Sequence, residues 1–148
     1  MVLNLLIGMG TMVACLLLQA YLLVLAIRYY AQHEQWLASS KFGSSLIVLI
    51  TVMLLLVIGN LVQIAMWAWV FILIEEFDTF NSAFYHSSVN FATLGYGDIV
   101  MSERHRLLGP LESVNGVIMI GVSTAALTWA IQDVIKRSAV VLNPSTHQ

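Results

Sequence analysis

Three long apolar runs constrain this 148-residue chain more than any other feature of its sequence. Residues 1–27 and 42–74 contain no charged side chain, and residues 107–132 contain a single one, Glu112. An unbroken apolar run of about 18 residues is already enough to suggest a membrane helix. Because each run exceeds that length, the sequence predicts an all-α integral membrane protein that spans a lipid bilayer three times.

The few charged residues exclude several function classes. Only 9% of the residues are charged, whereas soluble domains carry about 25%. The six Lys and Arg residues are scattered, so nucleic-acid binding is not expected. Cys15 is the only cysteine, which rules out a disulfide within the chain. We expect no soluble ligand-binding domain, because no repeat or change of composition indicates a second domain.

The basic residues predict the orientation in the membrane. With three spans, Arg28, Lys41, Lys136 and Arg137 fall on one side. The positive-inside rule places that side in the cytoplasm. We therefore expect a multi-pass protein of the cell (inner) membrane, with the amino terminus outside and the carboxyl terminus in the cytoplasm.

The segment between the second and third runs does not fit a span. "FNSAFYHSSVNFA" is long enough for a short helix but too short and too polar to cross a bilayer. Asp78 or Asn81 could cap the start of this helix. We expect this helix to enter the membrane and an extended chain to return to the same side. Because lipid cannot satisfy free backbone groups, the returning strand must be buried in protein or lie along a water-filled path.

The hexapeptide "TLGYGD", Thr93 to Asp98, follows that helix and has the residue types of such a strand. Carbonyls that all face one path require successive residues to alternate between left- and right-handed backbone conformations. Glycine adopts the left-handed conformation cheaply, which explains Gly95 and Gly97 at alternate positions. Leu94 and Tyr96 would then point away from the path, into surrounding protein.

The stretch "AFYHSSVNFATLGYGD" resembles the pore helix and selectivity filter of potassium channels. The flanking runs are similar to the outer and inner helices of that family, so the resemblance covers residues 42–132. It is nearest to the small prokaryotic potassium channels without a soluble domain, with one extra amino-terminal helix. The resemblance implies a homotetramer, since one filter strand cannot surround an ion.

The domain boundaries follow from this resemblance. We expect an extra membrane helix over 1–30, a cytoplasmic loop over 31–41, a pore domain over 42–135 and a short cytoplasmic tail over 136–148. Within the pore domain we expect an outer helix at 42–75, a pore helix at 79–92, a filter at 93–98 and an inner helix at 107–135.

The resemblance also implies roles for the filter residues. The permeant ion would be K⁺, bound by the backbone carbonyls of Thr93, Leu94, Gly95, Tyr96 and Gly97. The Thr93 hydroxyl would add the innermost ligand, and Asp98 would place negative charge at the outer mouth. Tyr85 would pack behind Tyr96. Passive conduction makes and breaks no bond, so we do not expect an enzyme.

Several residues depart from the pattern of that family. The departures are Leu94 in place of valine, Asn90 and Ala92 in place of threonines, His86 in place of a second aromatic ring, and Val89 in place of an acid that would hold Asp98. They leave a weakly selective monovalent cation channel open as an alternative. A separate alternative is a non-conducting regulatory subunit, in which the first helix would bind and control a larger channel.

One face of the third run carries small and polar residues. Its members are Glu112, Asn115, Gly116, Met119, Ser123 and Ala126. Their helical spacing places them on one side, which could line a cavity or press against the pore helix. Glu112 is either a gating carboxylate that attracts cations or a buried hydrogen-bond partner of His86, Ser87 or Asn90, and the second interpretation is favoured.

Gating is the least constrained property. Gly116 and Gly121 could act as hinges or permit close helix contacts, with Gly121 the preferred hinge. His86 and His105 could tune a pH response, although ordinary packing is favoured. The first helix lacks a ladder of arginines, so we do not expect voltage sensing. The sequence does not indicate the stimulus that opens the pore.

Overall fold

The structure is a computed structural model that describes residues 1–33 and 42–142. Within these ranges the chain is entirely helical apart from its turns and loops. Its helices are α1 (Val2–Gln32), α3 (Phe42–Leu73), α4 (Phe80–Phe91) and α5 (Leu108–Leu142).

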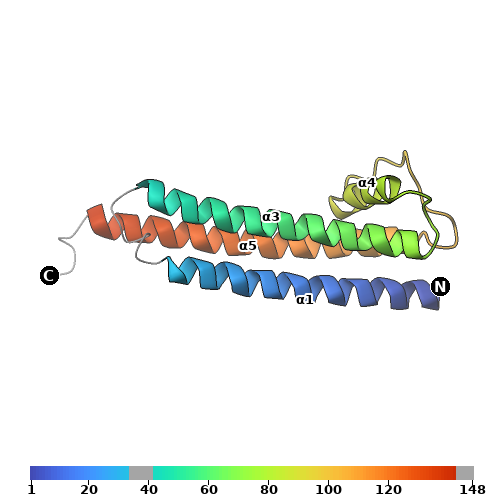
Figure 1. The fold of residues 1–148 in the computed structure, drawn as a ribbon, viewed down its shortest axis with the longest axis horizontal. Coiled ribbons are helices and arrows are strands. Elements are labelled where there is room, and N and C mark those ends of the chain that lie inside the picture. The colour runs from blue at the N-terminus through green and yellow to red at the C-terminus, as the bar shows by residue number, and fades with distance from the viewer. Residues whose placement is uncertain (34–41, 143–148) are drawn as a thin grey trace.

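The three long helices run side by side, and the short α4 lies next to one end of α3 (Figure 1). The amino terminus lies at the end of the bundle that carries α4, and α5 ends at the opposite end (Figure 1). Three segments are long and apolar enough to cross a membrane: Val2–Gln32, Ser45–Leu73 and Leu108–Arg137. The predicted all-α fold with three helices that could span a membrane is thus confirmed for the described part of the chain.

Two apolar clusters hold the bundle together. Near α4, the buried side chains of Trp67, Phe71, Phe91 and Met119 pack between α3, α4 and α5. In the other half, Tyr30 and further apolar side chains of α1, α3 and α5 form the second cluster. The helices therefore meet through side chains from every long element, and α1 packs against both α3 and α5.

A chain of amide and hydroxyl groups joins the three long helices between these clusters. Gln63 Nε2 on α3 donates to Gln19 Oε1 on α1 at 2.7 Å. Gln19 Nε2 in turn donates to Ser123 Oγ on α5 at 2.9 Å. All three residues are buried. A single α1 side chain thus links the two helices that flank α4 in the sequence.

The last helix is longer than the sequence analysis predicted. We expected it to end at 135 and a tail to occupy 136–148, whereas α5 continues to Leu142. Residues 136–142 contain neither glycine nor proline, and the first proline after them is Pro144. Since the residue before a proline avoids the helical conformation, the helix can run up to that point. The rest of the predicted tail, 143–148, lies outside the described residues, as does most of the predicted loop.

The other boundaries differ by one or two residues. The outer helix ends at Leu73 instead of 75, and α4 occupies Phe80–Phe91 instead of 79–92. The cap of α4 is Thr79, whose Oγ1 accepts a hydrogen bond from the Ser82 N–H at 3.3 Å. The expectation that Asp78 or Asn81 caps this helix was wrong. Threonine in extended conformation at this position supplies the same acceptor.

Candidate functional site

The chain leaves α4 through backbone hydrogen bonds that turn it sharply. The Thr93 N–H donates to Asn90 O at 2.8 Å, and the Leu94 N–H donates to Val89 O at 2.9 Å. These bonds satisfy carbonyls at the end of α4 that have no partner within the helix. The segment "TLGYGD" therefore starts at a defined position relative to α4.

The backbone of this segment alternates as the sequence predicted. Gly95 and Gly97 have positive φ angles of 60° and 73°. Thr93 joins them with a φ of 58°, which sequence reasoning missed because threonine rarely adopts this conformation. Three alternate residues are thus left-handed, and the intervening Leu94 and Tyr96 are not among the positive-φ residues.

Every residue from Thr93 to Asp98 is exposed in the single chain. Leu94 is 53% exposed and Tyr96 66% exposed, so neither side chain is covered by its own subunit. A Cβ atom added to Gly95 or Gly97 would meet nothing within 4 Å. The glycines are therefore required by their φ angles and not by crowding within the chain.

Asp98 is held by Tyr85. The Tyr85 hydroxyl donates to Asp98 Oδ2 at 2.7 Å. This hydrogen bond lowers the pKa of Asp98 below its ordinary value and raises the pKa of Tyr85. Val89 is buried and supplies no polar group for this purpose. The structure thus gives Tyr85 a partner in Asp98, a contact that we did not predict.

Glu112 is buried at the contact between α4 and α5. Its Oε1 is hydrogen-bonded to Ser87 Oγ, and its Oε2 lies 3.4 Å from Asn90 Nδ2. These are two of the three partners that the sequence suggested for a structural role. The neighbouring Asn115 is also fully buried.

The small residues of α5 differ in their surroundings. A Cβ atom on Gly116 would lie 2.1 Å from Phe91 O, so only glycine fits where α5 crosses the end of α4. The same atom on Gly121 would meet nothing within 4 Å. Ser123 is buried against Gln19. Within one chain, Gly116 and Ser123 pack inside the subunit, and Gly121 lies exposed in open space.

His86 connects α4 to the segment that follows residues 93–98. Its Nδ1 lies 3.0 Å from Ile99 O, and its Nε2 lies 2.8 Å from Asn90 Nδ2. The rings of Phe71 and Phe77 pack against the imidazole, with centroids 5.8 and 5.0 Å away. A cavity of about 550 Å³ lies beside these groups, between α4, Gly95, Gly97 and the start of α5.

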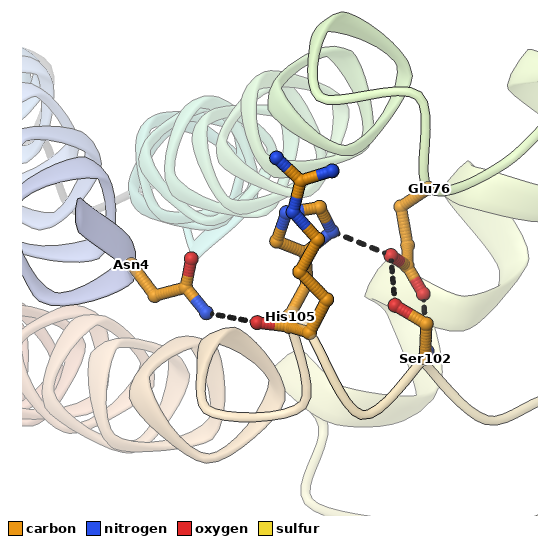
Figure 2. Close-up of polar contacts among 5 residues, drawn as sticks. Asn4, Glu76, Ser102 and His105 are labelled. Carbon is orange, nitrogen blue, oxygen red and sulfur yellow. Dashed lines mark hydrogen bonds and ion pairs between the residues drawn. The ribbon is translucent and has the colours of Figure 1, made fainter. Parts of the chain in front are cut away.

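A second polar cluster ties the outer loop to the bundle (Figure 2). Glu76, just beyond α3, accepts hydrogen bonds from the backbone N–H of Ser102 and, at 2.8 Å, from its hydroxyl. It also pairs with His105 Nδ1 at 2.7 Å. Burial opposes ionisation of Glu76, but the bonds from Ser102 and His105 outweigh it and lower the pKa of Glu76.

The amino-terminal helix reaches the same cluster. Asn4 Nδ2 on α1 donates to the backbone carbonyl of Arg104 at 2.5 Å (Figure 2). The cluster therefore connects α1, the end of α3 and the loop that leads into α5. We expected His105 only as a pH-sensitive or packing residue and did not predict that Asn4 and Glu76 belong to this cluster.

No group of three or more His, Cys, Asp and Glu side chains forms a metal site within the described ranges. Comparisons of the chain with curated proteins and with solved structures gave no match. A family model described as "Ion channel" matches residues 59–133, which is just over half of the 148-residue chain. The match includes the carboxyl-terminal half of α3 from residue 59, all of α4, the glycine-rich segment and most of α5. The chain therefore belongs to an ion channel family.

Proposed function

We propose that this protein is a potassium-selective channel that conducts K⁺ passively through a filter formed by residues 93–97. The observation that carries the proposal is the alternating backbone, with positive φ at Thr93, Gly95 and Gly97, inside the region matched by the ion channel family. Such alternation turns successive carbonyls toward one side of the strand. Carbonyl oxygens in a row can replace the water shell of K⁺.

Four copies of the chain surround the ion path in this proposal. A single strand offers ligands from one side only, and the Leu94 and Tyr96 side chains are uncovered in one subunit. Neighbouring copies would cover them. The end of the bundle that carries the amino terminus and the filter faces outside, in agreement with the distribution of Lys and Arg.

The alternative of a weakly selective cation pore has one observation in its favour. Val89 offers no polar group to Asp98, so an exposed hydrogen bond from Tyr85 holds this residue instead. A filter with a looser outer end would discriminate less between K⁺ and Na⁺.

The reversal potential of the purified protein in a planar bilayer tests both ideas. With KCl on one side and NaCl on the other, a value near the K⁺ equilibrium potential and block by barium are expected for the proposed function. A value near zero would support the weakly selective pore. Absence of current from protein shown to be tetrameric would contradict conduction under those conditions and favour the regulatory subunit.

A further inference from the structure

The side chain of Glu112 is completely buried where α5 meets α4. None of the salt bridges among the described residues involves it. A charged side chain at such a depth in a membrane protein is expensive without a partner. Its neighbours are instead the neutral side chains of Ser87 and Asn90.

The protons available at this contact indicate which group donates. Ser87 Oγ lies 3.0 Å from Ile64 O and is also hydrogen-bonded to Glu112 Oε1. A serine hydroxyl has one proton, so it can donate to only one of them. When it donates to the Ile64 carbonyl, the contact with Glu112 requires a proton on the carboxyl. Glu112 Oε2 then remains free to accept from Asn90 Nδ2.

The hydrogen bonds continue from Asn90 to the outer end of the filter. The second proton of Asn90 Nδ2 points to His86 Nε2 at 2.8 Å, which makes this nitrogen an acceptor. A neutral imidazole then carries its proton on Nδ1, which lies 3.0 Å from Ile99 O. Ile99 directly follows Asp98. Every donor in this series has an acceptor.

We propose that Glu112 in its protonated form, Asn90 and His86 constitute a relay that positions the outer end of the filter from α5, and that this relay determines how well the pore selects K⁺. The inference rests on the proposed function of conduction through residues 93–97. The relay residues touch no ion; they act through the backbone at Ile99.

Such a relay would support residues 93–98, which have few contacts within their own subunit. The residues from Thr93 to Asp98 are exposed in their own subunit, and a Cβ atom added to Gly95 or Gly97 would meet nothing within 4 Å. Within the subunit, the hydrogen bond from Tyr85 holds Asp98, and the relay holds the next residue, Ile99. Selectivity depends on the number and orientation of the carbonyls, so a displaced outer end alters it.

Three variants and one control test the relay in a bilayer with KCl opposite NaCl. Glu112→Gln retains a neutral group with a carbonyl acceptor and an NH₂ group that can replace the carboxyl O–H as donor, and we expect wild-type selectivity. Glu112→Leu removes both bonds. His86→Phe retains a ring between Phe71 and Phe77 but removes the bonds to Asn90 and Ile99. Thr51→Val changes an α3 hydroxyl that bonds only within its own helix and should have no effect.

We expect Glu112→Leu and His86→Phe to lower the K⁺/Na⁺ permeability ratio at least tenfold, a shift of about 59 mV in reversal potential. Recovery with Glu112→Gln separates a positioning role from a general packing defect. The relay is refuted if both disruptive variants keep wild-type selectivity, or if Glu112→Gln loses as much as Glu112→Leu. An unselective wild type would instead refute the proposed function.

Infrared spectroscopy tests the relay without any current. At neutral pH the wild type should show the C=O stretch of a protonated carboxyl that is absent from Glu112→Gln. The frequency of this band should shift in His86→Phe, because the hydrogen bond from Asn90 changes. A spectrum with ionised carboxylates alone, or a band unaffected by His86→Phe, would overturn the relay whether or not the channel conducts.

Discussion

The segment of residues 93–98 and the contact between α4 and α5 are adjacent in the fold, but the first is exposed in the single subunit and the second is buried within it. Residues 93–98 are exposed, and their glycines have open space around them. At the contact between α4 and α5, by contrast, Glu112 is fully buried and Gly116 lies against the Phe91 backbone. The contact between α4 and α5 is thus complete within one subunit, whereas in the proposed tetramer other copies of the chain would cover residues 93–98.

The two regions therefore require glycine for different reasons. At Gly97 a side chain has room but the backbone conformation disfavours it. At Gly116 the backbone is an ordinary helix, and the neighbouring carbonyl leaves no room. Substitutions at each position should consequently damage different properties.

The largest effect is expected for Gly97→Ala. A left-handed conformation costs a residue with a Cβ about 1–2 kcal/mol, and the proposed tetramer would pay it four times. We expect assembly to persist and selective K⁺ current to disappear in the bilayer recording. Gly10→Ala, in a helix with open space around it, should conduct normally. Selective current from Gly97→Ala would contradict the assignment of the filter.

Gly116→Ala should damage the fold more than the filter chemistry. The added methyl would collide with Phe91 O, and overpacking of this kind costs about 1–3 kcal/mol or more. We expect a lower thermal unfolding temperature in detergent. Gly121→Ala serves as the matched control on the same helix and should unfold like the wild type. Equal stability of both variants would mean that α5 does not approach α4 so closely.

A smaller loss of stability is expected for Gln19→Leu, because this variant removes the α1 amide that links α3 and α5. Interhelical hydrogen bonds in membrane proteins contribute about 0.6 kcal/mol on average, up to about 1.7 kcal/mol. Chemical unfolding in detergent should detect this decrease. Adding Gln63→Leu should restore part of the lost stability, because it removes the buried Gln63 amide that Gln19→Leu leaves without a partner. An additive loss in the double variant would contradict the link.

The smallest effect concerns acid and the outer cluster around Glu76. The folded protein lowers the pKa of this carboxyl, so its contribution to stability is present above the unfolded pKa of about 4.3. It is lost as the pH falls through the lower folded value. We expect the Ser102 amide to lose protection against hydrogen exchange as the pH falls through the lowered pKa of Glu76. Glu76→Gln should show fast exchange already at neutral pH; slow exchange there would exclude the cluster as a pH-dependent contact.

Local sequence signals were sufficient for the spans and for part of the candidate filter. Apolar runs identify a membrane helix without knowledge of its neighbours, and the spacing of Gly95 and Gly97 shows the need for alternating backbone. The positive φ of Thr93 was hidden, since nothing about a threonine signals this conformation. The extension of α5 to Leu142 was also missed, although residues 136–142 contain no glycine or proline that would end the helix.

By itself, the sequence determined a three-span helical membrane protein with a glycine-spaced strand, because hydrophobic length and backbone conformation are properties of neighbouring residues. Only the tertiary structure decided which side chains meet: Glu112 with Ser87 and Asn90, Tyr85 with Asp98, and Gln19 with both Gln63 and Ser123. A buried polar group needs a partner, but the sequence does not name it, since that partner arrives from another helix through the packing of the whole bundle.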